Sequence, residues 1–328
     1  MSFISVLLAL LLEQARPLSR GNLVHASLRA WVRWSTRNFD AGKSLHGWLA
    51  WGFAVVGPSL AALIIYWLLD VLLGWPLAVI WSVMVLYATL GFRQFSFHFT
   101  QIRDALADGD EDRARELLAS WQQIDAKELP RSEIVRHVIE YSVLSAQHHV
   151  FGVLAWFSVL AVFGFGPAGA VLYRLSEFVV RYWQHKSTTH HQPVSNALRQ
   201  TATDAWVAID WIPVRMTAIS FAVVGSFEEA IDGWRNFEPR FDGDNDGILL
   251  AATSGAVNLR LGKKASVATS PLDGIHAIPL GIPDVSGESA SGQTPELAHL
   301  AVIVGLVWRT VVMWMVLLAL LTLARLLG

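Results

Sequence analysis

The sequence predicts an all-α fold: a polytopic membrane bundle of helices, with further helical and loop segments on the cytoplasmic side. Of its 328 residues, 53% are hydrophobic and 16% are charged, whereas ordinary soluble domains carry about 25% charged residues. The apolar residues gather in blocks, and many of the 15 tryptophans lie near block ends, as in interfacial aromatic belts. We therefore expect one membrane domain over residues 1–328, with polar segments at 16–46, 93–148, 183–205 and 227–297.

Composition also limits the classes of site and partner. The chain has no cysteine, which excludes disulfides and thiolate zinc sites. Its formal net charge is −2, so nothing global argues for nucleic acid as a partner. The lipid bilayer is the expected partner, and the expected location is the inner (plasma) membrane, crossed several times.

The N-terminal part predicts three apolar helices. Residues 2–15 form a short one, expected to stay uncleaved because neither a basic region nor a small-residue cleavage site flanks it. Residues 16–46 are basic, so the positive-inside rule places this loop in the cytoplasm and the N-terminus outside. Residues 48–70 and 76–92 are expected to cross the membrane as a pair joined by a turn at 74–76.

Two helices are expected within the polar segment 93–148. Acidic residues at 108–112 precede an apolar pattern of helical period, where the helix dipole favours negative charge. Pro130 opens a second helix with apolar positions at helical spacing.

Residues 150–182 are apolar with a break at 164–167. The half after the break carries Arg174, Glu177 and Arg181. It is therefore either a second, partly polar span or a helix that lies in the membrane interface.

The C-terminal part predicts two more spans. Residues 206–226 are expected to form a helix entered through Pro213, since the first N–H groups of a helix need no partner. Residues 264–297 are rich in Ser, Gly, Pro and Thr, which is typical of an ordered loop or a partly disordered segment. Residues 298–327 are the final span.

The segment Asp210-Trp-Ile-Pro-Val-Arg215 is the first candidate site. A charge inside an apolar run is expensive and usually faces a polar cavity or a partner. The planar fork of Arg215 would suit a phosphate or carboxylate. Alternatively, Arg215 pairs with Asp210 or extends its guanidinium to the lipid headgroups.

Residues 242–247 match the opening of a calcium loop, D-x-D-x-D-G. The twelfth position of such a loop must be a bidentate acid, and here it is Thr253. The alternative is a simple turn, which Asp and Gly favour. The small residues at 251–262 predict a helix that allows close approach of a neighbouring backbone or a ligand.

Histidines form a third group of candidates. Neutral imidazoles suit zinc, copper or iron, but adjacent histidines on a helix point about 100° apart and rarely share one ion. We expect surface or interfacial positions and assign no metal ligand. The residues concerned are His98, His137, His148, His149, His185, His190 and His191.

The order of these motifs resembles the CobD/CbiB family of membrane proteins. The matching parts are Glu140 in its helix, the span with Trp156, the segment ending at Arg215, and the turn 245–247 before small residues. The resemblance implies closure of the amide bond between cobyric acid and an aminopropanol unit in cobalamin synthesis. It further implies ATP and Mg²⁺ as cofactors, and a corrinoid or another anionic small molecule as the bound partner.

The same resemblance assigns roles to residues by their positions. The candidate catalytic residues are Glu140, Glu177 and Asp210, and the candidate substrate-binding residues are Arg215, Asn245 and Gly247.

The chain departs from the family pattern in its acidic helix, which in the family reads E-S-V-A-E-N-T-S-D-G. Here Leu144 replaces the second Glu of that pattern, Ser145 replaces the Asn and His148 replaces the Asp. The related AmpE membrane modulators share a near-identical Asp-Trp-Ile-Pro-Val-Arg segment and also lack these acids. The alternative function is therefore a non-catalytic, AmpE-like membrane protein with a regulatory or binding role. The turn at 245–247 favours the CobD/CbiB function, and the lost acids favour the alternative.

Overall fold

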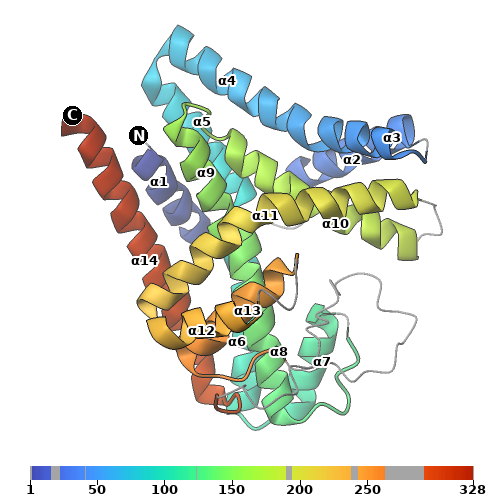
Figure 1. The fold of residues 1–328 in the computed structure, drawn as a ribbon, viewed down its shortest axis with the longest axis vertical. Coiled ribbons are helices and arrows are strands. Elements are labelled where there is room, and N and C mark those ends of the chain that lie inside the picture. Colours follow the sequence, from blue (N-terminus) through green and yellow to red (C-terminus); the bar gives the residue numbers. More distant parts are fainter. Residues whose placement is uncertain are drawn as a thin grey trace. The chain divides into compact units, whose positions relative to one another are not determined.

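The computed structural model describes residues 2–15, 23–40, 42–122, 124–189, 194–237, 243–262 and 292–327. Every regular element in these ranges is a helix (Figure 1), and Leu259 and Gln293 form an isolated β-bridge. Four helical stretches of the described chain are long and apolar enough to cross a membrane: Ser44–Leu73, Arg131–Val162, Asn196–Val224 and Leu297–Ala324. The predicted all-α membrane bundle is confirmed.

The chain divides into two compact units, each assembled from separate stretches of sequence. Unit 1 comprises Met1–Arg93, His148–Pro213 and Trp314–Gly328, and unit 2 comprises Gln94–Gln147 and Val214–Met313. The single domain expected over 1–328 stays a prediction.

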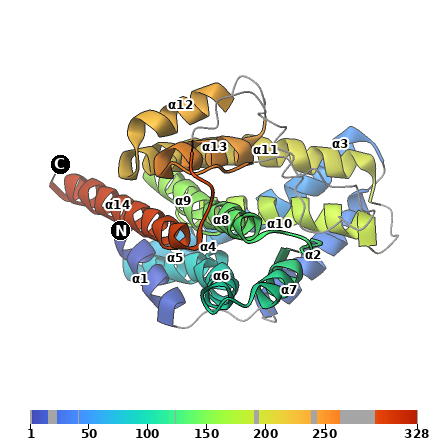
Figure 2. The same cartoon turned by 90° about the horizontal axis from the view of Figure 1, so that it is seen from below.

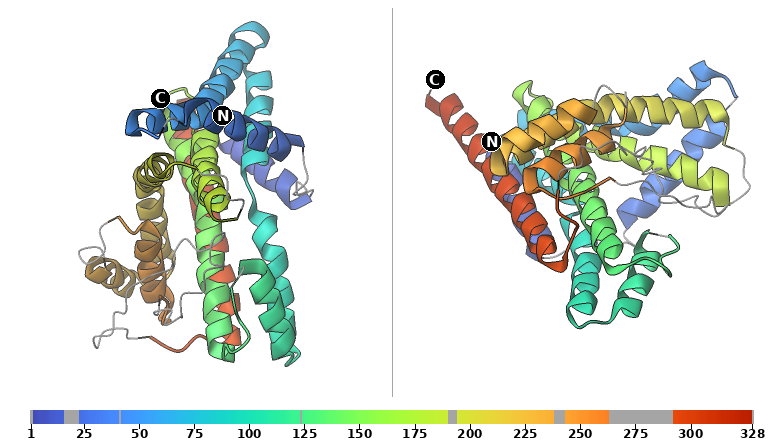
Figure 3. Two further views of the ribbon diagram at one scale, coloured as in Figure 1. Left: turned by 90° about the vertical axis from the view of Figure 1, so that its right-hand side faces the viewer. Right: turned by 60° about the horizontal axis from the view of Figure 1, so that its bottom comes forward.

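The first helices of unit 1 include a hairpin of apolar helices. They are α1 (Ser2–Ala15), α2 (Leu23–Phe39), α3 (Ser44–Trp51), the π-helical turn η1 (Gly52–Val56), α4 (Gly57–Leu73) and α5 (Trp75–Thr89). The hairpin joins α4 to α5 (Figure 3) through Gly74, whose φ of 87° is a conformation that glycine adopts without steric cost. The predicted turn between two apolar helices is confirmed.

The expectation that residues 16–46 form a loop is wrong in part, because helix α2 occupies most of this segment. This helix buries Val32, Ser35 and Thr36 on one face and exposes its arginines on another. Ser35 and Thr36 donate their hydroxyls to the carbonyls of Ala50 and Val32, so the polar groups of this buried face are satisfied.

The second stretch of unit 1 holds α9 (Gly152–Val162), α10 (Ala168–Thr189) and the first part of α11 (Asn196–Val224). The predicted break between the apolar halves is confirmed at residues 163–167. Trp67 Nε1 donates a hydrogen bond to the Gly164 carbonyl at 3.0 Å, which ties this turn to α4.

Two expectations for α11 are wrong. The helix begins at Asn196 rather than at residue 206, because Leu198, Ala202 and Ala205 bury a helical stripe within a polar sequence. Pro213 therefore lies in the helix interior, not near its start.

Unit 2 contains α6 (Phe92–Ala107), α7 (Glu111–Gln122), α8 (Arg131–Ala146), α12 (Phe227–Phe237), α13 (Asn245–Val257) and most of α14 (Leu297–Leu327). The helix starts predicted for α7 and α8 are confirmed. Asp110 Oδ1 accepts from the Arg113 amide at 2.9 Å, and Pro130 is the N-cap residue of α8. However, α8 is more than a polar-segment helix. It continues through η2 (Gln147–Phe151) into α9 as one 32-residue apolar stretch.

Helices α12 and α13 lie side by side (Figure 2) and approach each other through glycines. A Cβ atom on Gly255 would lie 2.1 Å from the Glu229 carbonyl oxygen, and one on Gly233 would lie 2.6 Å from that of Ala251. The close approach expected from small residues is confirmed, although the helix ends at Val257 and Asn258 follows in the left-handed conformation. Most of the predicted loop 264–297 lies outside the described residues.

Candidate functional site

Buried polar side chains of unit 1 join two of the predicted catalytic residues to neighbouring charges. Glu177 on α10 accepts from Arg174 Nη1 at 2.5 Å and from Arg181 Nε at 2.6 Å. Asp210 on α11 is fully buried and accepts from the Tyr173 hydroxyl at 2.7 Å. Helix α10 supplies most of this group: Tyr173, Arg174, Glu177 and Arg181.

The two arginines decide the charge state of Glu177. Burial alone would raise the pKa of this carboxyl, but the positive charges of Arg181 and Arg174 outweigh it and lower the pKa to about 2. Glu177 is therefore an anion at neutral pH and a fixed counter-ion for both guanidinium groups.

His148 lies between Arg181 and Asp210. Arg181 Nη2 is 3.4 Å from His148 Nδ1, and His148 Nε2 is 4.0 Å from Asp210 Oδ2. Because a guanidinium only donates, this contact fits the tautomer of His148 that carries its proton on Nε2, which faces Asp210. The Trp206 ring packs edge-on against His148, with centroids 5.3 Å apart.

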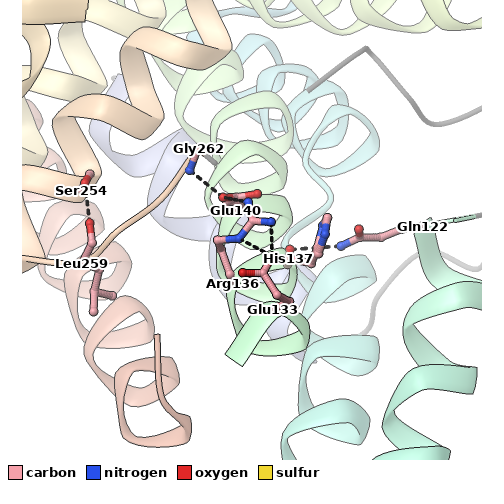
Figure 4. Close-up of polar contacts among 8 residues, drawn as sticks. All are labelled: Gln122, Glu133, Arg136, His137, Glu140, Ser254, Leu259 and Gly262. Atoms are coloured by element: carbon pink, nitrogen blue, oxygen red, sulfur yellow. Dashed lines mark hydrogen bonds and ion pairs between the residues drawn. The ribbon is translucent and has the colours of Figure 1, made fainter. Parts of the chain in front are cut away.

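Glu140, the third predicted catalytic residue, lies in unit 2 and is held by other groups (Figure 4). Its Oε1 accepts from Arg136 Nη1 at 3.0 Å and from the Gly262 amide at 2.7 Å. Arg136 also donates to Glu133. The Glu140 carboxylate thus links α8 to the chain segment that follows α13.

The predicted substrate-binding residues of unit 2 meet at the start of α13. Arg215 Nη1 lies 3.4 Å from Asn245 Oδ1, so the guanidinium is directed to the amide of the predicted turn. Gly247 donates its amide hydrogen to Asp244 Oδ1 at 2.8 Å. Asn245 and Gly247 belong to the first helical turn rather than to a turn before the helix.

Asp244 is the N-cap of α13, which favours the turn interpretation of residues 242–247 over the calcium loop. Burial raises the pKa of Asp244, and the hydrogen bond from the Gly247 amide offsets part of that rise.

The histidines that the structure describes are divided between the units. His98 stacks on Trp121 with centroids 5.7 Å apart, and the His137 carbonyl accepts from Gln122, both in unit 2. His148 and His149 belong to unit 1. His190, His191 and the His185 side chain lie outside the described part of the chain.

Comparison with known proteins decides the family. The family described as CobD/Cbib protein matches residues 4–273, which is most of the chain. The chain belongs to the CobD/CbiB family.

CobD/CbiB relatives from three bacteria illustrate how far the similarity reaches. The cobalamin biosynthesis protein CobD of Stutzerimonas stutzeri is 29% identical over 275 residues, covering 83% of this chain and 81% of the relative. Its namesake in Chromobacterium violaceum is 31% identical over 197 residues, covering 58% and 60% respectively. The Leptospira interrogans protein of the same name is 27% identical over 197 residues, covering 58% and 59%. No solved structure matches the chain.

Several residues of this CobD/CbiB site were not singled out from the sequence. Arg174 and Arg181 flank Glu177 at three- and four-residue steps, a spacing that predicts helical ion pairs once α10 is recognised. The contact between Tyr173 and Asp210 joins residues 37 positions apart, and no local pattern indicates it.

Proposed function

We propose that this CobD/CbiB protein is an integral, multi-pass protein of the inner membrane. In this proposal it closes the amide bond between a carboxyl group of cobyric acid and the amine of an aminopropanol unit. Support comes from the family match over residues 4–273 and from relatives that are named as cobalamin biosynthesis proteins. The four apolar helices of the described chain support the location.

The observation that carries the proposed chemistry is the series of contacts that runs from Glu177 through Arg181 and His148 to Asp210. An amine must lose a proton as the C–N bond forms, and a buried carboxylate is a suitable acceptor. We assign that role to Asp210, which Tyr173 orients by hydrogen bonding. His148, with its proton on Nε2, would stabilise the charge on Asp210.

The carboxylic-acid substrate of this reaction needs a cationic binding site. Arg181 is a cation with 30% of its side chain exposed, and its positive charge would attract a carboxylate or phosphate. In unit 2, Arg215 with Asn245 would bind an anionic group.

ATP and Mg²⁺ are implied by the family, and two of the predicted carboxylates, Glu177 and Glu140, are held by other groups. Both oxygens of Glu177 are bonded to arginines, and Glu140 Oε1 is bonded to Arg136 and Gly262. Mg²⁺ requires carboxylate oxygens that are free to coordinate it beside several waters. We therefore assign no step to a metal ion. ATP, as a second substrate, would activate the carboxyl so that phosphate leaves as the amide forms.

The test is direct synthesis by the purified protein in lipid nanodiscs. Cobyric acid, aminopropanol or its phosphate, ATP and Mg²⁺ are supplied, and the amide is measured by mass spectrometry. In parallel, the gene is expressed in a strain that lacks its own CobD/CbiB protein. The proposal expects product and growth from the wild type, and a loss of about a hundredfold or more from Asp210→Asn.

Asp204→Asn is the matched control, because Asp204 is exposed on the same helix and bonds only to Gln200 among the contacts shown here. It should retain activity. If wild-type protein that is folded and inserted gave neither product nor growth, the proposal of catalysis would be refuted. That result would favour the AmpE-like binding or regulatory role.

A further inference from the structure

Pro213 interrupts the hydrogen bonding of α11 directly beside Asp210. Proline has no backbone N–H, so residue 213 cannot donate to the Ile209 carbonyl one turn earlier. Inside an apolar bundle there is no bulk water to replace such a donor, and an unsatisfied carbonyl is strongly unfavourable.

The indole of Trp156 supplies the missing donor. Its Nε1 lies 2.9 Å from the Ile209 carbonyl oxygen and donates to it from the neighbouring helix α9. Trp156, Ile209 and Pro213 all belong to unit 1. The side chain of one helix thus replaces the backbone group that the sequence of another helix removes.

The same substitution of donor occurs a second time in unit 1. In the π turn η1, the Gly57 amide bonds the Gly52 carbonyl, five residues earlier. The next donor in that register would serve Phe53, but it is Pro58 and has no N–H. Trp31 Nε1 donates to the Phe53 carbonyl instead, at 3.2 Å. Two independent examples indicate a recurring use of tryptophan in this chain.

We infer that Trp156 is a positioning residue for Asp210, and that it acts by completing the hydrogen bonding of the turn interrupted by Pro213. Asp210 directly follows Ile209, so the bond from the indole fixes the peptide that leads into the catalytic candidate. The Asp210 carboxylate can then receive the Tyr173 hydroxyl at 2.7 Å. The catalytic part of this inference rests on the proposed function of Asp210; the pairing of Trp156 with Pro213 does not.

Another indole bond provides a matched control. Trp81 Nε1 donates to the Ala62 carbonyl at 3.0 Å, in the hairpin of α4 and α5. Four residues after Ala62 is Tyr66, which lies within α4 and has its own N–H. The Trp81 bond therefore adds to a helical donor rather than replacing one.

The experiment is a double-mutant cycle with Trp156→Phe and Pro213→Ala, read by thermal unfolding in nanodiscs and by amide synthesis. Alanine at 213 restores a backbone N–H to Ile209 and makes the indole bond dispensable. We expect Trp156→Phe to lower kcat by about tenfold or more with KM little changed, since the part-buried Ile209 carbonyl loses its donor. In the Pro213→Ala background the same change should cost no more than about twofold.

Trp81→Phe should stay within about twofold of wild type in either background. A penalty for Trp156→Phe that is equal with and without Pro213 would overturn the inference, because a pure packing role predicts no coupling. Since the coupling is also measured in the unfolding midpoint, it can be tested even if no variant makes the amide. In that case the proposed function fails while the pairing of Trp156 with Pro213 stands.

Discussion

Glu177 is the residue on which the charge balance of α10 depends. Its carboxylate is buried and faces two guanidinium groups, those of Arg174 and Arg181. Glu177→Gln would leave both cations beside a neutral amide, and removing one partner of a buried ion pair costs about 3 kcal/mol or more. We expect the free energy of unfolding in nanodiscs to fall by about that amount. Glu116→Gln, which removes an exposed pair with Arg113, should change it by less than about 1 kcal/mol.

Glu177 also predicts how the stability of the protein changes at acidic pH. The pKa of Glu177 is lowered from 4.5 to about 2 in the folded protein, so folding favours its ionised form. The stability that this provides is fully present above pH 4.5 and is lost as the pH falls towards 2. Unfolding midpoints measured from pH 6 to pH 3 should therefore fall less steeply in Glu177→Gln than in wild type. Parallel curves for the two proteins would contradict the assignment.

Asp244 makes a separate prediction about the start of α13. Its carboxylate accepts from the Gly247 amide at 2.8 Å, which is an N-cap. Asp244→Ala should destabilise the protein by about 1 kcal/mol, and Asp244→Asn by only a few tenths, because asparagine caps equally well. Addition of Ca²⁺ should leave the unfolding midpoint of the wild type unchanged. A calcium-dependent rise that Asp244→Ala abolishes would restore the metal-loop interpretation.

The residue scale also shows what a sequence can and cannot indicate about the site. Glu177 and Asp210 were recognised from their places in motifs, and the structure puts them in one unit. Their partner Tyr173 was not recognised, since its contact with Asp210 depends on how two helices pack and not on spacing. His148 stands at the position of a family Asp, and only the structure shows that it lies between Arg181 and Asp210.

At the scale of helices, the glycines of α12 and α13 determine how closely the pair can pack. A Cβ on Gly255 would lie 2.1 Å from a backbone oxygen, and backbone cannot move aside as a flexible side chain can. Gly255→Ala should therefore destabilise unit 2 by about 1–3 kcal/mol through overpacking. Gly305→Ala is the control, because no atom lies within 4 Å of its added Cβ. In α14 that change should be neutral or stabilising by up to about 1 kcal/mol; equal losses in both variants would show that the close approach is unimportant.

Helix boundaries were predictable where local chemistry sets them and not where packing does. Gly74 and Pro130 mark boundaries correctly because each restricts the backbone itself. Pro213 gave a wrong boundary, because proline normally lies near a helix start. Here it lies inside α11, and the indole of Trp156 from a distant segment replaces the missing donor. Residues 196–205 are helical for a similar reason, because Leu198, Ala202 and Ala205 form a buried apolar stripe.

At the scale of the whole molecule, the absence of cysteine makes the topology directly measurable. Under the positive-inside rule, we expect the basic segment 16–46 and its helix α2 on the cytoplasmic side. The stretch Ser44–Leu73 is long and apolar enough to span a membrane, and we expect it to cross outwards. Helix α5 has 15 residues, or about 22 Å, which is short of the roughly 30 Å hydrocarbon core. The return of the chain to the cytoplasm through residues 76–92 therefore stays a prediction.

Single cysteines test this path without background labelling. Ser27 on α2 and Ser120 on α7 are exposed, and so is Phe163 in the turn after α9. We expect a membrane-impermeant maleimide to label Phe163→Cys in intact spheroplasts, and Ser27→Cys and Ser120→Cys only in inside-out vesicles. The reason is that Arg131–Val162, which is long and apolar enough to cross a membrane, lies between Ser120 and Phe163 in the sequence. Labelling of Ser120→Cys and Phe163→Cys from the same side would mean that this stretch does not span the bilayer, and the buried charges of α8 would then belong to a water-facing unit.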